Sequence, residues 1–309
     1  MIVLTVVLLS IFFTGCELPE HIMEEIDKQE ILLQERYDEV LKGLSKTQVA
    51  HLETYMEKKG ALITDDFETV IEEKMATLEN PDIDFSKMTE KEMEAYLSEV
   101  FVLFGEIVGN EMNEIFAQGH QALNVANDFL NSSFYSSAIS DWSVFYIIEA
   151  YEQELLTKKV SSHYKNPITR EEFCELVIKL YEKTSGPVEG TSDHLFTDTN
   201  NPDINKAFHL GIVNGVGNNR FDPNGNITRE QIAVMFDRLL NALEVDFALT
   251  MEYRFFADEK DIADWAKNSV QTLNKLQILN GVGNDRINPK GTATKEQAIV
   301  MLVRLFDNL

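Results

Sequence analysis

The sequence predicts an all-α protein with two parts, an N-terminal helical bundle or stalk and a C-terminal domain of three helical repeats. Apolar residues recur at intervals of three, four and seven through much of residues 17–136, which is typical of amphipathic helices. Downstream, residues 211–239 and 277–305 align without a gap and are identical at 16 of 29 positions. A match of this length indicates an internal repeat.

The N-terminus has the pattern of an export signal. Residues 2–13 form an apolar run, which is shorter than the ~20 residues that a membrane-spanning helix needs. Thr14-Gly15-Cys16 follows and resembles a bacterial lipobox, although Phe13 replaces the usual leucine and no basic residue precedes the run. The resemblance implies that residues 1–15 are removed and that Cys16, the first mature residue, carries a lipid in the membrane. Ordinary secretion with an incidental Cys16 is the alternative, and both predict an exported protein.

Residues 17–136 form an acidic helical domain that we assign to no family. They carry 27 acidic and 9 basic side chains, a net charge of −18 within a total of −25. Such a surface repels phosphate backbones, so nucleic acid is excluded as a partner. We expect three to five helices with breaks at residues 45–47, at Gly60 and at residues 80–81. Thr89 and Glu92 form a capping box before another helix. These helices would act as a spacer or as a platform for an unknown protein partner.

The C-terminal domain divides into copy 1 (137–187), copy 2 (193–244) and copy 3 (253–309). Each copy is predicted as a helix, a loop and a second helix. The second helices begin with capping boxes formed by Thr169 with Glu172, Thr228 with Gln231, and Thr294 with Gln297. Glycine and asparagine tolerate positive φ, so the loops at residues 215–218 and 281–284 are expected to end the first helices of copies 2 and 3.

These copies resemble S-layer homology (SLH) domains. The aromatic-x-Asp openings are Phe196-Thr197-Asp198 and Phe256-Ala257-Asp258, and the helix starts cover residues 168–172, 227–231 and 293–297. The resemblance implies a pseudo-threefold helical body in which each lobe combines helices of neighbouring copies. It also implies grooves that bind secondary cell-wall polysaccharide, which often carries a pyruvate ketal.

Candidate ligand residues follow by position in the SLH motifs. Arg170 and Arg229 would bind a ketal carboxylate, because a guanidinium offers a planar fork of donors, and Lys295 is a weaker third candidate. Trp142 and Trp265 are candidate sugar platforms. Both lie on the apolar faces of their helices, and this position favours burial in the core instead.

Further candidates are acidic residues and glycines. The three aspartates would accept sugar hydroxyls or cap helices, and the two glycines would let backbone approach a ligand or serve the turn alone; they are Asp141, Asp198, Asp258, Gly215 and Gly281. In copy 1, residues 154–156 replace the expected glycine turn. A copy kept only for folding is therefore an alternative.

The residues predict no enzyme, metal site or cofactor. The six histidines are scattered, and no nucleophile elbow or phosphate-cradling loop occurs. Cys174 lies in an apolar helical pattern and is predicted to be a buried structural thiol. We therefore expect a non-enzymatic protein of the bacterial cell envelope that binds wall polysaccharide. The alternatives are a protein–protein interaction module with degenerate repeats and a helical hydrolase with a wall anchor.

Overall fold

The computed structural model describes residues 18–76, 88–189, 195–245 and 251–309. These residues belong to two compact units, one ending at Asn131 and the other spanning Ser132–Leu309. The described residues form helices and loops with only isolated β-bridges, so the all-α prediction is confirmed. The predicted export segment and Cys16 lie outside the described residues. No helix among the described residues is both long enough and apolar enough to span a bilayer.

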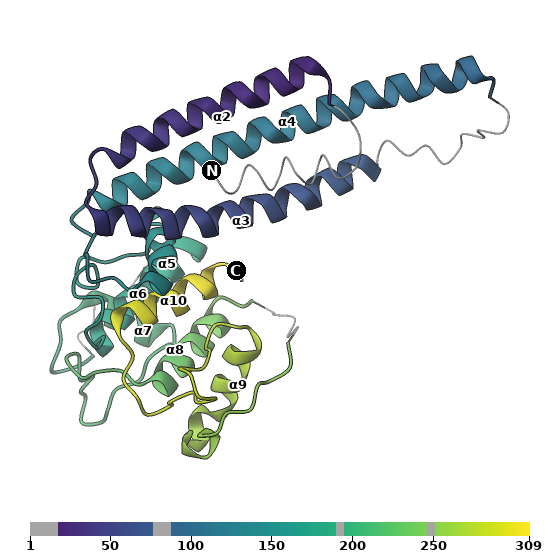
Figure 1. The fold of residues 1–309 in the computed structure, drawn as a ribbon. Coiled ribbons are helices and arrows are strands. Elements are labelled where there is room, and N and C mark those ends of the chain that lie inside the picture. Colours follow the sequence, from purple (N-terminus) through teal and green to yellow (C-terminus); the bar gives the residue numbers. More distant parts are fainter. Residues whose placement is uncertain (1–17, 77–87, 190–194, 246–250) are drawn as a thin grey trace. The chain divides into compact units, whose positions relative to one another are not determined.

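The first unit contains three long helices. They are α2 (Glu20–Leu41), α3 (Lys46–Ala76) and α4 (Glu90–Leu130), and α4 lies between the other two (Figure 1). The predicted break at residues 45–47 and the Thr89 capping box are confirmed. The break predicted at Gly60 is wrong, because this glycine is buried inside the continuous helix α3. The predicted break at residues 80–81 lies outside the described residues.

The core of this unit contains side chains from all three helices. Ile26 of α2, Phe67 of α3 and Met112 and Phe116 of α4 are buried together. Glycine brings α2 close to α4, because a Cβ at Gly109 would lie 2.8 Å from the Cδ1 atom of Ile22.

The second unit contains six α-helices in its described part. They are α5 (Asp141–Glu152), α6 (Arg170–Ser185), α7 (Pro202–His209), α8 (Arg229–Ala242), α9 (Lys267–Lys275) and α10 (Lys295–Phe306), with 3-10 turns η2 (Glu259–Asp261) and η3 (Asp264–Ala266). Helix α6 packs against α7, α8 against α9, and α10 against α5. The second helix of each copy thus pairs with the first helix of the next copy, and copy 3 pairs with copy 1.

A ring of backbone hydrogen bonds joins the starts of the second helices. The N–H of Ile168 donates to the carbonyl of Ala293 at 2.9 Å, Ala293 donates to Ile227 at 3.2 Å, and Ile227 donates to Ile168 at 3.1 Å. All three predicted capping boxes follow this ring and are confirmed. The ring therefore fixes the three helix starts side by side at the centre of the unit.

The first helices end earlier than the glycine loops predicted. Each ends before one residue in the left-handed region, which is Glu154 with φ 56°, Gly211 with φ 71° or Gln277 with φ 58°. In copy 1, Glu154 supplies the left-handed residue at the place where the sequence lacks a glycine. Gly215 and Gly281 lie farther along the loops and have another role, described below.

Candidate functional site

The two motif arginines hold the loop of the following copy. Arg229 donates from Nε to the carbonyl of Ile287 at 2.8 Å and from Nη2 to the carbonyl of Asn280 at 2.5 Å. It is only 4% exposed. Burial lowers the pKa of Arg229 to about 10, although Asp258 acts in the opposite direction. The guanidinium thus stabilises the loop from beneath.

Arg170 makes the same contacts on copy 2 but is less buried. Its Nε donates to the carbonyl of Phe221 at 3.0 Å, and its Nη2 donates to the carbonyl of Asn214 at 3.3 Å. The guanidinium carbon also lies 4.7 Å from the centre of the Phe221 ring. Burial lowers the pKa of Arg170. A half-buried guanidinium in this position keeps some surface toward solvent.

Lys295 takes the third equivalent position and is 7% exposed. Its ammonium donates to the carbonyl of Lys159 and contacts Oε1 of Glu172, both at 2.7 Å. Lys295 thus joins the last copy to the first.

Asp198 and Asp258 bind the backbone of the glycine loops. The carboxylate of Asp258 accepts from the N–H groups of Ile287 and Asn288, each at 2.9 Å. Burial raises the pKa of Asp258, but these donors and Arg286 outweigh burial, so the net pKa is lowered. Asp198 makes the corresponding bonds in copy 2, and the net pKa of its carboxyl is lowered for the same reasons. Asp141 lies exposed in the first turn of α5.

Gly215 and Gly281 are required by packing inside the loops. A Cβ at Gly281 would lie 3.0 Å from the carbonyl oxygen of Arg286 and 3.1 Å from the Phe256 ring. At Gly215 the corresponding distances are 2.7 and 2.8 Å, to Arg220 and Phe196. The loop and the motif phenylalanine thus leave no room for a side chain.

The two tryptophans are exposed, so the expected burial is wrong. Trp142 is 53% exposed and Trp265 is 59% exposed. Each lies at the very start of a first helix, at the edge of the apolar face that its helix buries. The ammonium of Lys290 lies 5.9 Å from the Trp265 ring and 2.5 Å from Glu230. An indole, a cation and a carboxylate therefore share one surface.

The sequence analysis missed the glutamate that follows each basic residue. Glu230 accepts from the N–H of Ala263 at 3.0 Å, just before η3. Glu296 accepts from the N–H and hydroxyl of Ser140, at 3.2 and 3.1 Å, at the start of α5. Each glutamate therefore fixes the start of the next copy's first helix. A first-turn glutamate is usually solvated, and only its repetition in all three copies could have signalled this role.

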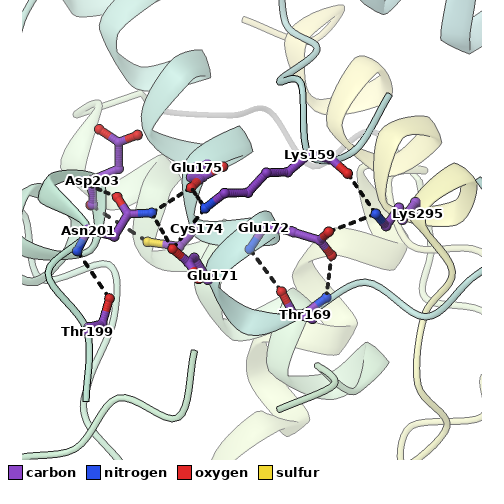
Figure 2. A network of polar contacts seen from close by, with 10 residues as sticks. All are labelled: Lys159, Thr169, Glu171, Glu172, Cys174, Glu175, Thr199, Asn201, Asp203 and Lys295. Atoms are coloured by element: carbon purple, nitrogen blue, oxygen red, sulfur yellow. Dashed lines mark hydrogen bonds and ion pairs between the residues drawn. The ribbon is translucent and has the colours of Figure 1, made fainter. Parts of the chain in front are cut away.

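The junction between copies 1 and 2 is closed by a polar network (Figure 2). The ammonium of Lys159 lies 2.9 Å from Glu171 and 2.6 Å from Glu175. The amide of Asn201, at the start of α7, donates to the same two carboxylates. Cys174 lies beside this network and is buried, as predicted, and burial raises the pKa of its thiol. These partners hold both carboxylates within the protein.

A polar cleft lies beside the glycine loop of copy 3. It has a volume of about 400 Å³ and is lined by Arg254, Phe256, Asn274, Gln277, Gly281 and Arg286, among others. No group of three histidine, cysteine or carboxylate side chains within the described ranges could hold a metal ion.

The sequence model of the S-layer homology domain family matches residues 197–233 and 255–299. These stretches contain the motif aspartates, both glycine loops and the starts of α8 and α10. This part of the chain carries S-layer homology sequence. SLH domains are cell-wall anchoring modules, so the chain is a protein of the cell envelope or cell surface. Copy 1 lies outside the matched stretches, and its assignment as a third SLH repeat stays a prediction.

The curated relatives are surface proteins and polysaccharide-degrading enzymes. The chain is 32% identical over 172 residues to an endoglucanase of Bacillus sp. (strain KSM-635), covering 54% of this chain and 18% of the relative. It is 33% identical over 145 residues to the exoglucanase XynX of Acetivibrio thermocellus, covering 45% and 13%. A cell surface protein of Thermoanaerobacter kivui is 27% identical over 101 residues, covering 33% and 13%. The chain thus spans less than a fifth of the length of each.

Proposed function

We propose that the C-terminal unit binds secondary cell-wall polysaccharide and anchors the chain to the wall without a covalent bond. The exposure of Trp142 and Trp265 carries this proposal. A large aromatic side chain that is half exposed gains little from burial, whereas it offers a rigid, amphipathic face to a partner. Both indoles lie at the same place in their copies, at the start of the first helix.

A lysine accompanies each exposed indole. Lys290 contacts Trp265, and Lys165 takes the position of Lys290 in copy 1, because the residue before each accepts from the equivalent backbone N–H, of Glu230 or Glu296. An exposed ammonium suits a carboxylate such as a pyruvate ketal. We therefore expect two ligand surfaces, one on copy 3 and one on copy 1.

The junction between copies 1 and 2 lacks this combination. Copy 2 has no tryptophan, and Asn224 stands where the other copies have lysine. Lys159 instead binds Glu171 and Glu175 from within the protein. This junction would serve the fold rather than the ligand.

The motif cations remain candidates of lower rank. Arg170 is half-buried and could still turn part of its guanidinium to a ligand. Both bonding nitrogens of Arg229 already bind carbonyls, and Lys295 is buried between Glu172 and Lys159. We assign Arg229 and Lys295 chiefly to holding the loops and Arg170 to a shared role. Asp198, Asp258, Gly215 and Gly281 would shape the loops behind the ligand.

The acidic helices would act as a spacer or as a platform for a protein partner. If Cys16 carries a lipid, the chain would connect the membrane surface with the wall. Mass spectrometry of the mature N-terminus tests this connection, and unmodified protein released into the medium would contradict it. We propose no enzymatic activity, since the activities in the relatives' names belong to proteins of which this chain covers 8–18%.

The second candidate is a protein-interaction module, favoured by the absence of a family match in copy 1. Sedimentation of the full chain with native wall sacculi, and with sacculi stripped of secondary polymer by acid, separates the two. Glycan anchoring predicts binding to native sacculi alone. Binding to neither would leave the protein partner as the better explanation.

A further inference from the structure

Copy 3 contains a polar cleft that copy 2 replaces with packed side chains. In the alignment of the two copies, Phe208 stands in the place of Asn274 and Gly211 in the place of Gln277. Phe208 packs edge-on against the motif residue Phe196, with ring centres 5.5 Å apart. The same loop and helix can thus close on an aromatic side chain, so the fold itself does not require the cleft.

Two amide residues of copy 3 maintain the cleft. Asn274 is 2% exposed and spans its wall, because Oδ1 accepts from the N–H of Arg254 at 3.0 Å and Nδ2 donates to the carbonyl of Leu279 at 3.1 Å. Gln277 adopts φ 58°, a conformation that costs a non-glycine residue roughly 1–2 kcal/mol. Glycine is the low-cost residue at this position and is present in copy 2. Copy 3 therefore accepts strain and places an amide at the cleft.

The charges around the cleft are already paired. Arg254 contacts Asp285 at 2.5 Å, and Arg286 contacts Asp258 at 3.4 Å. An anionic ligand would have to compete with these carboxylates. Amide side chains and loop backbone instead offer donors and acceptors together, which suits hydroxyl and acetamido groups. The volume of about 400 Å³ lies near the lower end of small-molecule sites, ~300–1,000 Å³, and suits one sugar unit.

We propose that this cleft binds one neutral N-acetylhexosamine unit of a wall glycan, at a site separate from the tryptophan surfaces. The inference rests on the proposed function, because it assumes that the ligand of this unit is a glycan. It adds the sugar class and a site that copy 2 lacks.

The test is a titration of the full chain, labelled with ¹⁵N-glycine, with N-acetyl-D-glucosamine. Gly281 and Gly283 line the cleft, and Gly215 and Gly217 are their counterparts in copy 2. We expect saturable shifts of the amide signals of Gly281 and Gly283, while those of Gly215 and Gly217 stay in place. Gly283→Ala and Gly217→Ala identify the signals.

Two variants copy the residues of copy 2 into copy 3. Gln277→Gly relieves backbone strain and should stay folded, and Asn274→Phe should fill the cleft. Each should weaken the titration at least fivefold. A titration unchanged in Gln277→Gly, in a protein whose other signals are unchanged, would overturn the role given to this amide.

D-glucuronate is the matched anionic probe. Shifts with glucuronate alone would overturn the neutral class, and no shift with either sugar would overturn the site. Sedimentation of the same preparations with sacculi keeps the two proposals apart. Wall binding without a sugar response would refute the cleft alone, whereas a sugar response without wall binding would refute the proposed anchoring.

Discussion

Replacing Arg229 with alanine should destabilise the C-terminal unit, because this guanidinium supports the glycine loop of copy 3. The substitution removes two hydrogen bonds to backbone carbonyls, of 2.8 and 2.5 Å, from a side chain that is 4% exposed. Hydrogen bonds to a charged group contribute about 1.5–3 kcal/mol each. The two bonds together are therefore worth roughly 3–6 kcal/mol.

The cost of burying the charge offsets part of this gain. Burial lowers the pKa of Arg229 from 12.5 to about 10, and a difference of about 2.5 units corresponds to ~3 kcal/mol. Alanine removes this cost but leaves the carbonyls of Asn280 and Ile287 without their donor, at about 1–3 kcal/mol for each that stays buried. We expect the free energy of unfolding to fall by about 2–4 kcal/mol.

Urea unfolding followed by tryptophan emission measures this change. Both tryptophans of the chain lie in the C-terminal unit, so their emission reports on this unit alone. Arg220→Ala is the matched control, because this exposed arginine lies 3.4 Å from Asp198 and such surface pairs contribute about 0–1 kcal/mol. Arg170→Ala should fall between the two. Equal unfolding midpoints for Arg229→Ala and Arg220→Ala would refute the supporting role.

Three further predictions concern the same unit. Thr228→Ala should lower the free energy of unfolding by about 1 kcal/mol through loss of the capping box, whereas Thr228→Ser should restore most of it in the same urea assay. The pKa of Asp258 is lowered below its ordinary value of 3.8, so its contribution to stability is present above that pH and is lost as the pH falls through the folded-state pKa. Asp258→Asn should therefore flatten the acid limb of a thermal-stability profile, and an unchanged limb would contradict the assignment. Gly281→Ala should destabilise the loop by about 1–3 kcal/mol through crowding, and Gly43→Ala, at a site whose nearest neighbour is 3.9 Å away, is its control.

Local signals in the sequence predicted much of this architecture. The capping boxes at Thr169, Thr228 and Thr294 mark helix starts through contacts within four residues, so the sequence alone identifies them. The prediction at Gly60 was wrong, because glycine lowers helix propensity by only about 1 kcal/mol and burial against neighbouring helices outweighs it. Likewise Glu154 takes a left-handed conformation that no glycine advertises.

The site was harder to predict, because its decisive contacts join distant residues. Glu230 reaches Ala263, and Glu296 reaches Ser140 across 156 positions of the chain. Helical periodicity assigned Trp142 and Trp265 to apolar faces, but it does not define where the packed part of a helix begins. Both indoles lie at that limit and face solvent. Motif position found the two arginines, although only the structure shows that Arg229 is largely enclosed.

The most direct test of wall anchoring is the dissociation constant of the full chain for native sacculi, measured by sedimentation with Trp142→Ala and Trp265→Ala singly and together. Phe255→Ala is the control, because this residue is also aromatic and exposed but lies outside the two indole surfaces. We predict that each single variant weakens binding about tenfold, the equivalent of ~1.4 kcal/mol, that the double variant loses it, and that Phe255→Ala binds like the wild type. Unchanged binding of a folded double variant would contradict the proposal.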